Sequence, residues 1–228
     1  MNRAEIKNSF RLALDSRPAT CLWVYRNLLG YRWRPTWTCF VDDSTDLVIE
    51  GFQRSANSFA VRSFEAAQPR PLRIAHHAHL SSQIVRGVGL RKPVLLLIRE
   101  PVATLASYVA VWPQTPAPVA LKAYLGFYRR VQPFLGDCLV ADFERVTGDF
   151  SSVVAALNQR FGTSFRSPEE DDPAETYRHL TVGQGSFRHS ADPAGERRQG
   201  SDAILAALPE AALAEARSLY RQCLRTSV

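Results

Sequence analysis

Four short runs rich in Val, Ile and Leu alternate along the chain with segments of helical periodicity. The apolar runs cover residues 47–52, 73–77, 94–98 and 138–143, and the helical patterns cover residues 58–67, 81–86, 102–111, 119–135 and 150–161. Strands that are apolar throughout are typical of a sheet buried on both faces, and alternation of strand and helix predicts parallel strands. We therefore predict an α/β fold with a central parallel β-sheet flanked by helices.

The length and composition fit a single domain. The chain has 228 residues, of which 46% are apolar, and this is enough to bury one core. We divide it into an N-terminal layer (residues 1–45), a strand–helix core (46–165), a loop rich in Pro, Asp and Gly (166–200) and a helical segment (201–228). We expect an early helix near residues 4–14, a mobile loop that acts as a lid, and a last helix with Pro209 at its first position.

Arginine carries almost all of the basic excess. The formal net charge is +6, and lysine occurs only at positions 7, 92 and 122. The planar guanidinium suits phosphate and sulfate, although a genome that favours arginine codons explains the bias equally well. The charge therefore fits nucleotides, anionic substrates, nucleic acid and acidic lipid without choosing among them.

The cysteines and the apolar runs indicate the compartment. The four cysteines lack the spacing of a metal site or a disulfide framework, so we expect reduced thiols. The longest aliphatic run is far too short to cross a bilayer and no signal peptide is evident, so we predict a cytoplasmic protein without a transmembrane segment. An aromatic and basic run over residues 23–37 lacks a clean apolar face, and we interpret it as core or pocket wall rather than a membrane anchor.

A first candidate anion site follows the strand predicted at residues 47–52. Here Arg54, Ser55, Ala56, Asn57 and Ser58 lie between the strand and a helix. Backbone amides at a helix start bind anions, and Arg54 and the Ser58 hydroxyl would reinforce them. The Gly-Lys-Ser/Thr ending of a Walker A loop is missing. The alternative is an ordinary helix start with Ser55 or Asn57 as the N-cap.

A second candidate anion site follows the strand at residues 94–98. Arg99 stands at the strand tip, Pro101 presets the first turn of a helix, and Ser107 lies about two turns along it. Arg99 and Ser107 could hold one phosphate between them. The alternative is that Arg99 pairs with Glu100 or another carboxylate while Ser107 packs against a neighbouring helix. Two such sites in one small domain favour a ligand with two separated anionic groups.

In their order and separation, these two motifs resemble those of sulfotransferases that use 3′-phosphoadenosine 5′-phosphosulfate (PAPS). The resemblance covers residues 46–165 and implies a P-loop-like strand–loop–helix. It implies that the 5′-phosphosulfate is bound by Arg54, Ser55, Ala56, Asn57 and Ser58, and the 3′-phosphate by Arg99 and Ser107.

Three further positions are interpreted through the resemblance. The family usually has glycine at position 56, so with Ala56 we expect a backbone that avoids a strongly positive φ. Arg197 and Arg198 weakly echo a basic loop that closes over the 3′-phosphate in related enzymes, and a solvated charge run is the alternative. The acidic turn at Asp142 is interpreted as structural.

Three histidines lie between the two motifs, at the end of the strand predicted at residues 73–77. Strand alternation would put His77 and His79 on one face and His76 on the other. The family has a Lys-x-His-Leu/Val segment at the corresponding place. The resemblance therefore implies that His79 is the general base and that His77 replaces the lysine. A zinc site is the rival, but alternation separates the three rings and no fourth ligand is evident, so we predict no metal.

The resulting prediction is a transferase that moves a sulfuryl group from PAPS to a hydroxyl and releases 3′,5′-bisphosphoadenosine (PAP). The catalytic residues would be His79, His77 and Arg54. The expected acceptor is a small molecule, with carbohydrate, lipid and natural product left open, as is a homo-oligomer; no nucleic-acid partner is expected. The alternatives are a P-loop-type kinase that uses ATP and a module that binds PAP or other anions without catalysis.

Overall fold

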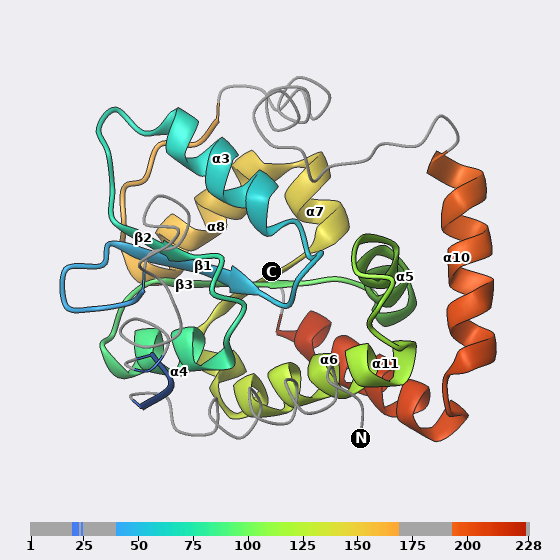
Figure 1. Ribbon diagram of the computed structural model, residues 1–228. Coiled ribbons are helices and arrows are strands. Elements are labelled where there is room, and N and C mark those ends of the chain that lie inside the picture. The colour runs from blue at the N-terminus through green and yellow to red at the C-terminus, as the bar shows by residue number, and fades with distance from the viewer. Residues whose placement is uncertain (1–19, 23, 25–39, 169–192, 227–228) are drawn as a thin grey trace.

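The predicted α/β architecture is confirmed by the structure. The computed structural model describes residues 20–22, 24, 40–168 and 193–226, with side chains described from residue 200 onward in the last segment. Its centre is a parallel sheet in the order β2-β1-β3-β4 (Figure 1). The strands are β1 (Leu47–Gly51), β2 (Ile74–His76), β3 (Val94–Ile98) and β4 (Leu139–Asp142). Each lies within one residue of its predicted bounds.

Helices cover both faces of the sheet (Figure 1). One face carries α3 (Asn57–Ala67), α7 (Phe143–Gly148) and α8 (Phe150–Phe161), and the other carries α4 (Ser81–Gly89), α6 (Ala117–Val131) and α11 (Glu210–Arg225). Helix α5 (Pro101–Val111) follows the tip of β3, and α10 (Pro193–Ala207) packs outside it. A 3-10 helix, η2 (Gln132–Asp137), precedes β4.

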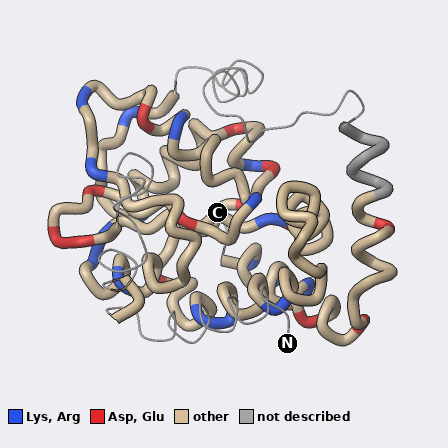
Figure 2. Tube along the Cα trace, viewed as in Figure 1, with Lys and Arg blue, Asp and Glu red and all other residues tan. Residues whose placement is uncertain are grey.

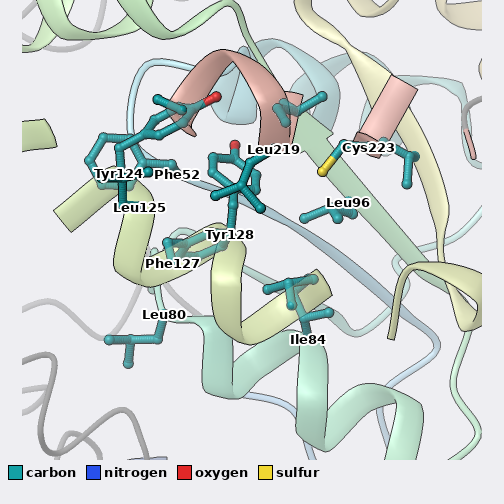
Figure 3. Packing of buried hydrophobic residues seen from close by; sticks show 14 of the residues in the cluster. Phe52, Leu80, Ile84, Leu96, Tyr124, Leu125, Phe127, Tyr128, Leu219 and Cys223 are labelled. Carbon is teal, nitrogen blue, oxygen red and sulfur yellow. The ribbon is translucent and has the colours of Figure 1, made fainter. Parts of the chain in front are cut away.

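Alternate residues of each strand enter two separate cores. Val48 and Leu96 belong to the core shared with α4, α6 and α11, whereas Ile49 and Leu97 belong to the core shared with α3 and α8. In the first core, Tyr124 of α6 packs edge-on against Phe52 and at a tilt against Tyr128, as Figure 3 shows. The sheet is therefore buried on both faces, which explains why its strands are mostly apolar.

Several predicted boundaries are corrected. The helix expected at residues 119–135 ends at Val131 and continues as η2, because Pro133 has no amide hydrogen to donate to the α-helical ladder. Pro209 is the N-cap of α11 rather than its first residue.

The mobile loop expected at residues 166–200 is wrong for residues 193–200, which form the first half of α10. Pro193 occupies a position that a helix start tolerates. The rest of that loop from residue 169, the early helix and nearly all of the aromatic run lie outside the described residues.

Two further expectations concern thiols and the membrane. Cys138 and Cys223 are free and buried, as expected of reduced thiols; Cys21 is buried, and Cys39 lies outside the described residues. Within the described part of the chain, none of the helices has both the length and the apolar character needed to span a bilayer.

Candidate functional site

The order of the strands marks one place at the edge of the sheet. From β1 the chain passes to β2 on one side, whereas β3 and then β4 lie on the other side of β1. In open α/β sheets, ligands bind outside the carboxyl ends of the strands at the point where the direction of winding reverses. That point lies here between β1 and β3. The loops that leave these two strands carry the two predicted anion motifs, so both motifs lie at the place where such a crevice is expected.

The loop after β1 differs from expectation in its backbone. Ala56 has φ 66° and ψ 18°, which is the left-handed region, and Arg54 has φ 73°. The expectation that residue 56 avoids a positive φ is therefore wrong: the turn from β1 into α3 needs this conformation even without glycine, at a cost of about 1–2 kcal/mol. Ala56 itself is the N-cap of α3, so neither Ser55 nor Asn57 has that role. Its side chain cannot accept a hydrogen bond, which leaves the first amides of α3 for another acceptor.

The two anion motifs contact each other directly. Arg54 Nε donates to Ser107 Oγ at 2.9 Å, across 53 residues of sequence. Arg99 Nη1 donates to the backbone carbonyl of Arg54 at 3.2 Å, and its guanidinium lies 4.0 Å from the centre of the Phe143 ring. Arg54, Arg99 and Ser107 thus lie together at the β1–β3 crevice.

The start of α5 is arranged differently from the start of α3. The carboxylate of Glu100, the N-cap residue, accepts a hydrogen bond from Ala103 N at 2.8 Å. Glu100 therefore caps the helix. This contact explains the Glu100 carboxylate without the ion pair with Arg99 that was the alternative. Because a carboxylate already occupies this helix end, an anion near β3 would be held by the side chains of Arg99 and Ser107 rather than by amides of α5.

The histidines do not follow strand alternation. Strand β2 ends at His76, and both His77 (φ 58°) and His79 (φ 51°) have left-handed backbones. The prediction that His76 faces away from His77 is therefore wrong. Their Nδ1 atoms lie 2.6 Å apart, so one donates to the other, and the His77 and His79 ring centres are 5.8 Å apart. On its other side, His77 Nε2 hydrogen-bonds with Ser58 Oγ at 3.0 Å.

Burial sets the charge of two of these rings. Desolvation, with smaller contributions from His79, His76 and Arg62, lowers the pKa of His77 to about 2. Desolvation, then Arg62 and His79, lowers the pKa of His76 to about 4. Both imidazoles are therefore neutral near pH 7, so His77 does not supply the positive charge of the lysine that it replaces. That charge falls to Arg54.

His79 faces two acceptors through one ring nitrogen. Its Nδ1 lies 3.0 Å from the carbonyl oxygen of Gly51 and 3.4 Å from Oε1 of Glu50. Because both partners accept, Nδ1 carries the proton, and in the neutral ring Nε2 keeps the lone pair that a general base needs. Sequence analysis did not single out Glu50. A carboxylate inside an otherwise apolar strand was the signal that could have found it.

The remaining candidates are placed only in part. Arg197 and Arg198 lie in α10, and their side chains are outside the described residues. The same helix packs on α5 at Gly200, where a Cβ would lie 3.6 Å from that of Ala106, the neighbour of Ser107.

Among the residues with described placement, no group of three or more His, Cys, Asp or Glu could hold a metal ion. Basic positions are distributed over many elements rather than confined to one (Figure 2).

A hollow lies at the opposite end of the sheet, near the start of β2. It is bounded by residues of α3 and of the segment that follows, among them Glu65, Pro69 and Leu72. Burial raises the pKa of Glu65, although Arg62 opposes this. None of the predicted site residues lines this hollow.

Comparisons with known proteins add a remote structural likeness. No protein-family model matches the sequence, and no curated protein matches it. Among solved structures, the chain is similar to mouse sulfotransferase SULT7A1 in complex with PAP, with 13% sequence identity and a TM-score of 0.46 over 82% of this chain and 86% of that one. A likeness this remote does not assign an activity.

Proposed function

We propose that the protein is a PAPS-dependent sulfotransferase. The observation that carries the proposal is the convergence of Arg54, Arg99 and Ser107 at the β1–β3 crevice, where the hydrogen bond from Arg54 Nε to Ser107 Oγ is 2.9 Å long. These residues come from two motifs that resemble the two phosphate-binding motifs of that family. Their meeting at the reversal point of the sheet supports one ligand with two anionic ends.

The residues present suit PAPS. The uncapped start of α3, together with Arg54 and Ser58, would hold the 5′-phosphosulfate. Arg99 and Ser107 would hold the 3′-phosphate through their side chains. In this structure Ser107 Oγ accepts a hydrogen bond from Arg54 Nε. When the nucleotide binds, a phosphate oxygen could replace this contact and accept hydrogen bonds from both side chains.

The proposed reaction assigns one task to each group. The acceptor hydroxyl transfers its proton to Nε2 of His79 as its oxygen forms a bond to sulfur. The bond between sulfur and the bridging oxygen breaks in line, and its electron pair leaves with PAP. Arg54 stabilises the charge that develops on that oxygen. His77, which is neutral, orients the Ser58 hydroxyl. Catalysis is then mainly positioning and charge stabilisation, as in phosphoryl transfer.

The acceptor remains a hydroxyl on a small molecule, with carbohydrate, lipid and natural product as the classes to screen. Its pocket would draw on the segment after α5 and on parts of the chain outside the described residues. Tyr108 and Trp112, whose ring centres are 4.6 Å apart, are the described aromatic residues closest in sequence to that segment.

The test is turnover of PAPS with a panel of hydroxyl compounds. We expect PAP and a sulfated product in equal amounts, no requirement for a divalent metal, and no phosphoryl transfer from ATP. Saturating PAP at about 100 times its Kd should add about 2.7 kcal/mol of stability, which raises Tm by roughly 5–11 °C for a domain of this size. Arg129→Ala is the control, since Arg129 is exposed on α6 and pairs with Glu215.

Other outcomes would replace the proposal. Transfer from ATP that is abolished by EDTA would indicate a kinase. Binding of many polyanions that weakens steeply with salt, without a preference for PAP, would indicate a general anion-binding module. Tight binding of PAP with no transfer to any acceptor would indicate a non-catalytic PAP-binding protein.

A further inference from the structure

Glu50 is a carboxylate buried inside the sheet. It lies in β1 between Ile49 and Gly51 and has no exposed surface. Alternation places it on the same face as Val48 and Phe52, which belong to the apolar core shared with α4 and α6. An ionised carboxylate in such surroundings is costly unless hydrogen-bond donors surround it. Its partners therefore indicate why it is there.

Three N–H groups face this carboxylate. Ala78 N donates to Oε2 at 2.9 Å, and Gly51 N donates to Oε1 at 3.2 Å. His79 Nδ1 lies 3.4 Å from Oε1. Two of these groups belong to the loop between β2 and α4, so Glu50 joins the centre of β1 to the loop that carries the histidines.

That loop has an unfavourable backbone which Glu50 stabilises. His77 and His79 both have positive φ, and Ala78 lies between them. A non-glycine residue in this region is strained and persists only where neighbouring contacts fix it. The hydrogen bond from Ala78 N to Glu50 fixes the middle of the loop, and the contact of His79 Nδ1 fixes its end.

We propose that Glu50 is the positioning residue for His79. It holds the loop in place and, together with the carbonyl oxygen of Gly51, keeps the proton on Nδ1, so that the Nε2 lone pair is available to an acceptor hydroxyl. The neighbouring rings of His76 and His77 also interact with His79, and both are neutral near pH 7. The carboxylate of Glu50 lies 3.4 Å from Nδ1 of His79. The consequence for turnover rests on the proposed function, whereas the tautomer of His79 does not.

The experiment combines ¹⁵N NMR of the imidazoles with kinetics. In the wild type, we expect neutral His79 to be mainly the Nδ1–H tautomer. In Glu50→Gln, which keeps the shape but loses the charge, we expect a mixture of tautomers. We also expect kcat to fall roughly 10- to 100-fold, as when the hydrogen-bond partner of a functional histidine is removed, while the Kd for PAP changes less than twofold. Glu65→Gln, on α3 at the hollow that none of the predicted site residues lines, is the charge-matched control and should change neither quantity.

Two results would overturn the proposal. One is a wild-type His79 that carries its proton on Nε2, which is measured without any variant and so does not depend on whether Glu50→Gln folds. The other is a folded Glu50→Gln protein with the wild-type tautomer and the wild-type kcat. An Nδ1–H population that falls in Glu50→Gln supports the proposal even when no sulfuryl transfer is found, in which case only the proposed function fails.

Discussion

Acidification from pH 7.5 to pH 5.0 should destabilise the protein through His76, which is buried, and His77, which is half-buried. Burial lowers the pKa of His77 to about 2 and that of His76 to about 4, from an ordinary value of 6.5. Below pH 6.5 the unfolded chain therefore binds protons that the folded chain does not. The free energy of unfolding is at its full value above pH 6.5 and falls as the pH drops towards the folded pKa values.

The size of the loss follows from the two pKa values. Each pH unit below 6.5 costs about 1.4 kcal/mol for a histidine that stays neutral in the fold. At pH 5.0 this amounts to about 2 kcal/mol for each ring, and about 4 kcal/mol for the pair is an upper bound because the two titrations are coupled through their Nδ1 contact. The total stability of a typical domain is roughly 5–15 kcal/mol, so the loss would be large.

Urea unfolding between pH 5.0 and pH 7.5 measures this loss. Asparagine can hydrogen-bond but does not titrate, so His76→Asn and His77→Asn should each remove about half of the pH dependence. The pKa of Asp149 lies below its ordinary value of 3.8 because Ser152 and Ser151 donate to its carboxylate, so it stays ionised throughout this range. Two results would refute the reasoning. One is a wild-type unfolding free energy that changes by less than about 0.5 kcal/mol between pH 7.5 and pH 5.0. The other is a change in the His76→Asn/His77→Asn double variant that is as large as the change in the wild type.

Three substitutions test the backbone around the site. Gly51→Ala would place a Cβ against the carbonyl oxygen and Cβ of Leu97, so we expect a loss of about 3 kcal/mol or more in urea unfolding. Gly89→Ala is its control, since a Cβ there meets nothing within 4 Å, and we expect no loss and a gain of up to about 1 kcal/mol. Ala56→Gly should stabilise by about 0.5 kcal/mol, because glycine removes the left-handed penalty but loses more chain entropy. A loss above about 1 kcal/mol in Ala56→Gly would contradict the φ of this residue.

The strands and most helices could be predicted because their signals are local. The apolar runs that became β1 and β3 are bounded by polar turns, and residues that alternate along them enter opposite cores. The helix over Phe150–Phe161 was predicted with its observed bounds. The meeting of the Arg54 and Arg99 motifs followed from a parallel sheet, since the carboxyl ends of its strands share one edge.

The details of the site depend on tertiary contacts that local patterns do not contain. Alternation failed at His77 because β2 ends one residue earlier and the chain turns left-handed. Ala56 takes a conformation that its residue type disfavours, because the tight turn into α3 imposes it. The role of Glu50 appears only when the loop at Ala78 folds back over β1 to donate to it.

The central claim is that Arg54 and Arg99 bind opposite ends of one adenine nucleotide. Calorimetric titration of PAP, adenosine 5′-phosphate and adenosine 3′-phosphate into the wild type, Arg54→Ala and Arg99→Ala tests it directly. We predict that the wild type prefers PAP to both monophosphates by roughly 10- to 100-fold, the worth of one hydrogen-bonded charged group. Arg99→Ala should no longer prefer PAP to adenosine 5′-phosphate. Arg54→Ala should no longer prefer PAP to adenosine 3′-phosphate. Equal affinity of the wild type for all three nucleotides would contradict the claim.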